Sequence, residues 1–197
     1  MNTHHVVIIG SGLAGLSVAL HLAQRRKVVV ISKRALRDGA SDWAQGGIAA
    51  VLDSHDSHDQ HVKDTLVAGA GLCDETATRF IVSHGREAIE WLIAQGVPFT
   101  PDADSPFGYH LTREGGHSAR RILHADDATG AAVQRTLIER VKATPNITVF
   151  ERHMLVDLVT TAKLGQPGEN RCVGLYALSI GVRHVPQIKP CGLFRVW

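Results

Sequence analysis

The chain of 197 residues is long enough to bury one full hydrophobic core. Its apolar share of 44% and charged share of 20% are typical of a globular protein and exclude a disordered chain. A formal net charge of +2 is too small to favour nucleic acid or an anionic membrane as a partner, and we predict neither.

The first residues predict a strand, a tight turn, a helix and a second strand. Val6–Ile9 and Lys27–Ile31 are apolar runs of strand length. Between them, Leu16, Leu20 and Ala23 form an apolar stripe at helical spacing. Continuous apolar strands on both sides of a helix indicate a parallel sheet that is covered on both faces. We therefore predict an α/β fold.

Residues 6–20 are apolar enough to resemble the core of a signal peptide. No Lys or Arg precedes them, no small-residue cleavage site follows, and fifteen residues are too few to span a bilayer. The three cysteines are odd in number and share no CxxC spacing, which disfavours a disulfide framework or a zinc site. We predict a cytoplasmic protein without a leader or a membrane span.

The middle of the chain predicts a long loop at residues 34–59, followed by helices and then strands. The expected helices are His61–Ala70, Glu75–Ser83, Glu87–Gln95 and Thr129–Lys142. The expected strands are Asn146–Glu151 and Met154–Thr160. The spacing of His55, His58 and His61 suggests a metal loop, but such histidines are more typical of a solvated turn, so we predict no metal site.

The sequence GSGLAG at Gly10–Gly15 matches the dinucleotide-binding pattern G-x-G-x-x-G. It lies between a predicted strand and a predicted helix, where the glycines allow a tight turn and close approach of a pyrophosphate to the helix N-terminus. We therefore predict that this turn binds a dinucleotide. The binding residues are Gly10, Ser11, Gly12, Leu13, Ala14 and Gly15.

The end of the second strand leaves the identity of the dinucleotide open. An acidic residue is expected there, about 20 residues after the turn, to bond the ribose hydroxyls. The chain has Ser32 and Lys33 instead. Ser32 can still bond a ribose hydroxyl, whereas Lys33 suits the 2′-phosphate of NADP, so a nicotinamide enzyme remains an alternative.

Three further stretches indicate which dinucleotide is bound, because they resemble a known family. SDWAQGGIAAVL, HVKDTLVAGAGLCDE and HLTREGGHSARRILHADDATG, together with GSGLAG, resemble the flavoproteins of the succinate dehydrogenase and fumarate reductase family. The resemblance extends from residue 6 to about residue 178, with the motifs in the family's order. It implies a Rossmann-like FAD-binding domain with a parallel sheet.

The resemblance implies FAD contacts beyond the first turn. Ser32 and Lys33 are placed at the adenosine ribose, and Met154 and Leu155 contribute main-chain contacts near the adenine. The segment along the flavin comprises Ala40, Ser41, Asp42, Trp43, Ala44, Gln45, Gly46 and Gly47. Paired glycines allow close backbone approach to a ring. Relatives that attach FAD covalently have a histidine where this chain has Ala40, so we expect non-covalent FAD.

Within the family, the motifs are closest to the members that oxidise L-aspartate to iminoaspartate, the first step of bacterial NAD biosynthesis. Succinate and fumarate enzymes typically place an apolar or amide residue before the glycine pair, whereas this chain has Glu114 before Gly115 and Gly116. A carboxylate there could pair with the ammonium of aspartate. The resemblance implies Glu114 as the substrate-orienting residue, oxygen or fumarate as acceptor, and hand-over of iminoaspartate to quinolinate synthase.

Family members continue beyond the length of this chain, with a capping domain that carries the catalytic arginine and histidines and with a C-terminal helical domain. We expect residues 1–178 to be the N-terminal part of the FAD-binding domain and residues 179–197 to be a tail from a truncation or frameshift. Two alternatives remain open. One is a non-catalytic dinucleotide-binding remnant, and the other is a different C4-dicarboxylate flavin oxidoreductase of the family.

Overall fold

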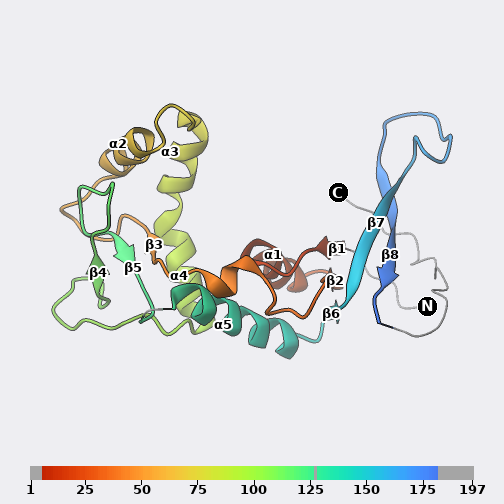
Figure 1. Cartoon of the computed structure of the whole chain (residues 1–197), viewed down its shortest axis with the longest axis horizontal. Coiled ribbons are helices and arrows are strands. Elements are labelled where there is room, and N and C mark those ends of the chain that lie inside the picture. The colour runs from red at the N-terminus through yellow and green to blue at the C-terminus, as the bar shows by residue number, and fades with distance from the viewer. Residues whose placement is uncertain (1–5, 127, 182–197) are drawn as a thin grey trace. The chain divides into compact units, whose positions relative to one another are not determined.

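The computed structural model describes residues 6–126 and 128–181, which form two compact units (Figure 1). Of the described residues, the first unit comprises 6–42 and 137–181, and the second comprises 43–126 and 128–136. Each is described by itself below.

A parallel sheet forms the centre of the first unit. Its strands β1 (Val6–Ile9), β2 (Val28–Ile31) and β6 (Ile147–Phe150) lie in the order β1-β2-β6. Both pairings are parallel. All four residues of β2 are buried, as expected for a central strand with both faces covered. The predicted parallel sheet is confirmed.

Helix α1 and a hairpin pack against this sheet. Helix α1 (Leu13–Ala23) buries Leu16, Ala19 and Ala23. The predicted apolar face of α5 (Thr129–Ala143) is also buried, through Val133, Leu137, Ile138 and Val141. A helix buries one stripe of its surface, so these positions show which side of each helix faces the interior.

A long antiparallel hairpin follows β6 in the chain and forms a two-stranded sheet of its own. Its strands are β7 (His153–Thr160) and β8 (Cys172–Ser179), and Figure 1 shows them as the extended blue pair. Leu175 of β8 packs in one cluster with Val29 and Ile31 of β2. Because alternate residues of a strand point to the same face, the hairpin lies on the face of β2 that carries Val29 and Ile31. Strand β8 was not predicted.

The second unit combines three helices with a small antiparallel sheet. The helices are α2 (His58–Ala68), α3 (Glu75–Ser83) and α4 (Gly85–Gln95). The sheet has the order β3-β5-β4, with β3 at Ile48–Ala49, β4 at Leu111–Thr112 and β5 at Ile122–Leu123. The three predicted helices are present, but the small sheet was not predicted because strands of two residues carry no periodicity.

The predicted loop at residues 34–59 is only partly correct. It contains a short 3₁₀ helix, η1 (Ala40–Trp43), and strand β3. Helix α2 begins at His58, earlier than the predicted His61, because the side chain of Ser57 accepts a hydrogen bond from the N–H of Gln60 and caps the helix.

The end of the chain remains largely undescribed. The predicted boundary at residue 178 falls near the end of β8, and the predicted tail from residue 182 onwards lies outside the described residues. Within residues 6–126 and 128–181, no helix has both the length and the apolar character needed to cross a membrane.

Candidate functional site

The predicted phosphate turn has the geometry of an anion-binding helix start. Gly10 has a φ of 113°, which favours glycine, and its N–H donates to the carbonyl of Ile31 at 2.9 Å. Gly12 is the N-cap of α1 in extended conformation, and no side chain caps the helix. The first turn of α1 contains no acidic residue. The N–H groups of this helix start are therefore available to a pyrophosphate.

The glycines of this turn differ in what they accommodate. A side chain at Gly15 would collide with the carbonyl group of Gly10 and touch the side chain of Ile8. A Cβ at Gly12 would meet only the hydroxyl of Ser41, 4.0 Å away. Gly15 is thus required by the packing of helix on strand, whereas Gly12 faces open space that a cofactor phosphate fits.

Ser32 lies where the adenosine end of a dinucleotide is expected. Its side chain is buried, and its hydroxyl lies 2.8 Å from the hydroxyl of Ser11 in the phosphate turn. Its backbone is held by Phe150 and His153, through N–H to carbonyl bonds of 2.9 and 2.8 Å. Ser32 is therefore a fixed polar point at the carboxyl end of β2, where open α/β sheets bind their ligands.

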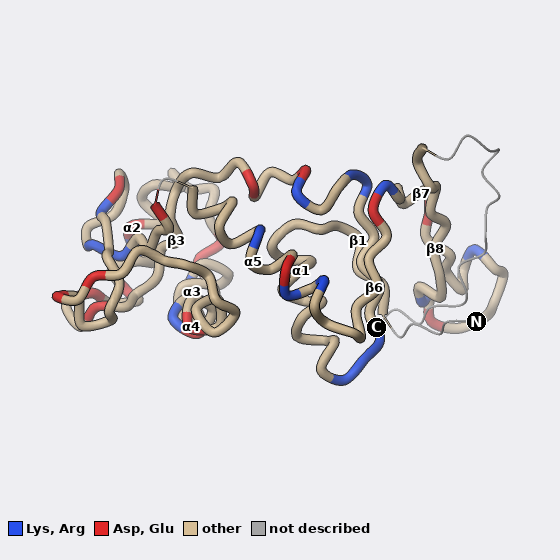
Figure 2. The backbone as a smooth tube through the Cα atoms, turned by 90° about the horizontal axis from the view of Figure 1, so that it is seen from below, with Lys and Arg blue, Asp and Glu red and all other residues tan. Residues whose placement is uncertain are grey.

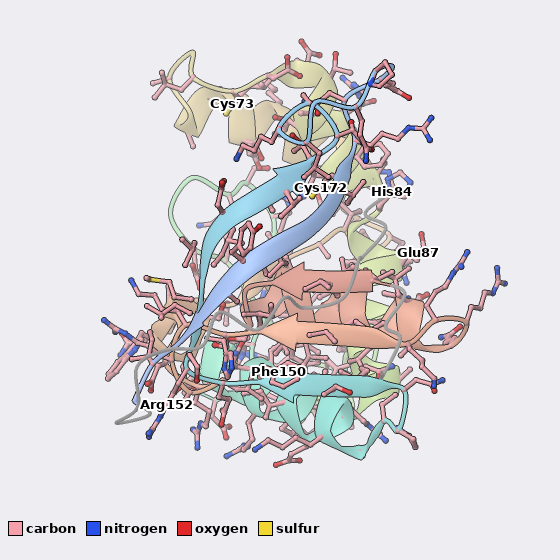
Figure 3. The ribbon with its side chains drawn as sticks, turned by 90° about the vertical axis from the view of Figure 1, so that its right-hand side faces the viewer. Cys73, His84, Glu87, Phe150, Arg152 and Cys172 are labelled. Atoms are coloured by element: carbon pink, nitrogen blue, oxygen red, sulfur yellow. The ribbon has the colours of Figure 1, made fainter. Side chains whose placement is uncertain are left out.

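A basic hollow adjoins Ser32 in the same unit. It has a volume of about 390 Å³, and its lining includes Lys33, Arg34 and Arg152 as well as Asp38. Figure 2 shows Lys and Arg positions between the labels β1 and β7, and Figure 3 shows Arg152 at the turn after Phe150. Its cations suit an anionic nucleotide. Met154 and Leu155 follow at the start of β7, where they pair with Leu178 and Ala177.

The two glycines of the AQGG stretch have separate roles. Gly47 directly precedes β3, and a Cβ there would collide with the carbonyl of Leu123 and the side chain of Ile122 in β5. Nothing lies within 4 Å of a Cβ built on Gly46. Gly47 is therefore needed by the small sheet itself, whereas the open space at Gly46 would allow close approach of a ligand.

Glu114 lies in the loop that joins β4 to β5. Its carbonyl accepts the N–H of His117 at 3.2 Å, and Gly116 turns the chain with a φ of 83°. Its carboxylate makes no hydrogen bond or ion pair with any described residue. A hollow of about 590 Å³ lies at the same loop, lined by Thr112, Arg113, Ser118 and Arg120. The loop thus combines cations at a hollow with an unpaired carboxylate.

A buried ion-pair network lies behind this loop. The guanidinium of Arg121 is fully buried and binds both oxygens of Asp56, at 2.7 Å each. Its remaining edge donates to Oδ2 of Asp64 at 2.6 Å. That oxygen also accepts the N–H and the hydroxyl of Ser118, at 2.8 and 2.7 Å. Arg121 is therefore structural.

Burial and hydrogen bonding set the charges in this network. Burial raises the pKa of Asp64, but the bonds from Ser118, Arg121 and Gln60 outweigh it and hold the pKa well below its ordinary value. Burial lowers the pKa of the neighbouring His61, and the charge of Arg121 lowers it further. Asp64 is therefore ionised and His61 neutral at neutral pH.

A second polar chain supports Arg120. Its Nε donates to the carbonyl of Leu111 at 2.9 Å, and a terminal nitrogen lies 3.3 Å from Nε2 of His110. Nδ1 of His110 lies 2.8 Å from Nε2 of His124, whose other nitrogen lies 3.4 Å from the hydroxyl of Thr100. These contacts hold Arg120 in place beside the hollow.

The three histidines considered as a metal loop have different environments. His55 bonds Asp53 through its ring nitrogen at 2.8 Å, whereas His61 is buried with its ring 5.6 Å from that of His117. His58 is the first residue of α2. Among residues 6–126 and 128–181, no three His, Cys, Asp or Glu side chains are grouped so that they could hold a metal ion.

The site contains four residues that were not predicted from the sequence, namely Asp56, Asp64, His110 and His124. The side chain of Asp56 is only 2% exposed, although the residues around it have the composition of a solvated turn. Asp64 lies on a helix of low mean hydropathy, where an acid is normally on the solvated face. The one available signal was Arg121 itself, since a buried arginine needs acidic partners.

We expect the chain to lose stability as the pH falls below about 4, the ordinary carboxyl range. Because the folded state holds the pKa of Asp64 below its ordinary value, the unfolded chain takes up that proton first. The stabilisation by ionised Asp64 is fully present above the pKa that Asp64 has in the unfolded chain. It is lost as the pH falls towards the lower pKa that Asp64 has in the folded chain. The check is the urea midpoint between about pH 6 and pH 3. In the Asp64→Asn variant the urea midpoint should depend less on pH. A midpoint that falls with pH as steeply as in the parent would contradict the prediction.

Known protein families and curated proteins resemble this chain over most of its length. The family model described as "FAD binding domain" matches residues 5–186. The chain is 70% identical over 173 residues to L-aspartate oxidase 1 of Ralstonia nicotianae, covering 88% of this chain and 32% of that protein. It is 55% identical over 181 residues to the L-aspartate oxidase of Pseudomonas aeruginosa, covering 89% and 34%. The chain thus spans about a third of the length of these relatives.

Solved structures share the fold. A variant of the quinol fumarate reductase FrdA of E. coli matches with a TM-score of 0.80 and 29% identity, over 89% of this chain and 29% of that chain. The Sdh1 complex of Mycobacterium smegmatis matches with a TM-score of 0.76 and 23% identity, over 89% and 31%. The latter likeness shows the fold alone.

Proposed function

This chain belongs to the FAD binding domain family, and we propose that it is the N-terminal part of an L-aspartate oxidase that oxidises L-aspartate to iminoaspartate. The observation that carries the proposal is the 70% identity to a protein of that name, against 29% to the fumarate reductase. The unpaired carboxylate of Glu114 supports aspartate over a substrate that lacks an ammonium.

The residues that would hold the pyrophosphate and the adenosine side of FAD lie in the first unit. The helix start at Gly12 fits the pyrophosphate, and Ser32 with Lys33 fits the adenosine side. FAD, when bound, supplies the acceptor for the hydride that leaves Cα of aspartate. Glu114 would accept a hydrogen bond from the substrate ammonium and orient the molecule. The cations at the hollow, Arg113 and Arg120, suit its carboxylates.

The finer parts of the proposal go beyond these residues. Oxygen or fumarate would reoxidise the cofactor, and the reaction would be the first step of NAD biosynthesis in the cytoplasm. Iminoaspartate would pass to quinolinate synthase. The names of the relatives support the reaction but carry neither the acceptor nor the hand-over.

The proposal is tested in a full-length protein, because the relatives are about three times as long as this chain. Residues 6–178 would replace the matching part of the Ralstonia nicotianae enzyme, giving what we call the exchange enzyme. We expect it to bind FAD and to oxidise L-aspartate at a rate within about tenfold of the parent. A folded exchange enzyme that binds FAD but oxidises succinate instead would contradict the proposal.

We also propose that FAD is held non-covalently and expect acid precipitation of the exchange enzyme to release yellow flavin into the supernatant. The stretch Ala40–Gly47 contains no histidine, cysteine or tyrosine that could form a bond to the flavin. The measurement is flavin absorbance in the supernatant and in the redissolved pellet. Flavin that remains with the pellet would show a covalent link.

A further inference from the structure

We propose that Asp64 is a positioning residue that holds the loop of Glu114 in the orientation needed for the substrate. The inference rests on the proposed function, since it assigns to Asp64 an effect exerted through Glu114. Asp64 touches neither Glu114 nor the hollow's cations Arg113 and Arg120 in any contact of the structure.

One face of α2 supports the loop. Residues 61, 64 and 68 lie on that face because positions three and four apart are neighbours on a helix. His61 packs against the ring of His117, with centroids 5.6 Å apart. A Cβ on Gly116 would lie 3.6 Å from the Cβ of Ala68. Asp64, between them, supplies the polar contacts to the loop.

A single oxygen of Asp64 joins the loop to the buried arginine. Oδ2 accepts three hydrogen bonds, two from Ser118 and one from Arg121, while Oδ1 accepts one from Gln60 at 2.9 Å. Arg121 follows Ser118 by three residues and is anchored on Asp56. Asp64 therefore ties the loop, just after the glycine pair, to a guanidinium that cannot move without breaking buried ion pairs.

The part of the loop that carries Glu114 is exposed. Glu114 and both glycines after it are exposed, and the turn bond from His117 to Glu114 lies within the loop itself. The Asp64 contacts at Ser118 are short hydrogen bonds that link the loop to α2, and they lie beside the contacts of the His117 ring with His61 and Arg121. Weakening them should let the carboxylate move away from a bound ammonium, and a displacement of about 1 Å can cost a hundredfold in rate.

The first measurement is hydrogen exchange on the full chain. Asp64→Asn keeps the size of the side chain and removes its charge, so we expect amide exchange in residues 113–118 to become at least about tenfold faster. Asp59→Asn is the matched control, because Asp59 lies on the same helix but pairs with exposed Arg79 and not with the loop. Equal exchange in the two variants would overturn the proposal. Should Asp64→Asn not fold, Ser118→Ala removes one of the three bonds to Oδ2 and takes its place.

The second measurement is a double-mutant cycle in the exchange enzyme, with aspartate oxidation and fumarate reduction followed on one preparation. We expect Asp64→Asn to raise KM for aspartate about tenfold and to change fumarate reduction less than about threefold. In the Glu114→Gln background, the same change should add no further loss of selectivity. If the losses of the two single variants add up in the double variant, or if Asp64→Asn slows both substrates equally, the positioning role of Asp64 is overturned and the role of Glu114 is unaffected. If Glu114→Gln slows aspartate oxidation and fumarate reduction equally, the proposed role of Glu114 is overturned, and the role of Asp64 falls with it.

Discussion

Gly12→Val is expected to abolish flavin binding while leaving the fold in place. Gly12 has a φ of −72° and a ψ of 175°, which valine adopts without strain, and a Cβ there meets only the hydroxyl of Ser41 at 4.0 Å. The branched side chain would instead fill the space next to the free N–H groups of α1, where a pyrophosphate must approach closely. The loss therefore reflects exclusion of the cofactor and not damage to the protein.

The measurement is the flavin content of the purified exchange enzyme, together with its far-ultraviolet circular dichroism. Gly15→Ala is the matched contrast, since a Cβ at Gly15 collides with the backbone of Gly10 and should weaken the fold itself. We expect the Gly12 variant to keep the parent spectrum with less than about a tenth of its flavin. Full flavin content in that variant would mean that the turn serves structure alone.

Much of the first unit was predictable because its signals are local. The strands at Val6–Ile9 and Val28–Ile31 are continuous apolar runs, and the turn between β1 and α1 has glycine at each position that needs it. The apolar stripe of α5 predicted its buried face for the same reason. By contrast, β8 was missed because its alternation is interrupted by Gly174 and by a register shift opposite Val159.

The site was less predictable because its support comes from residues distant in the chain. Asp56 and Asp64 reach Arg121 across 65 and 57 residues, and no spacing rule links an acid on a helix to an arginine in a later hairpin. Gly47 is predicted to lie along the cofactor, but its packing against β5 could not be predicted from the sequence. Such roles depend on tertiary packing, which local sequence does not encode.

Glu114→Gln is expected to lower kcat/KM for L-aspartate about ten- to a hundredfold in the exchange enzyme and to affect fumarate reduction far less. The change keeps the shape of the side chain and removes its charge. A charge-assisted hydrogen bond in a partly dry site contributes about 1.5–3 kcal/mol, which gives this range. Fumarate has no ammonium, so it loses no such bond.

Both rates must come from one preparation with its flavin content measured, so that lost cofactor is not mistaken for lost recognition. Glu87→Gln is the matched control, since Glu87 is an exposed acid in the first turn of α4 and outside the loop. The carboxylate of Glu114 has no partner among the described residues, so its removal breaks no contact within the described protein. A selective loss therefore measures the contact with the substrate ammonium. Equal losses for the two substrates would show that Glu114 organises the loop and does not recognise the ligand.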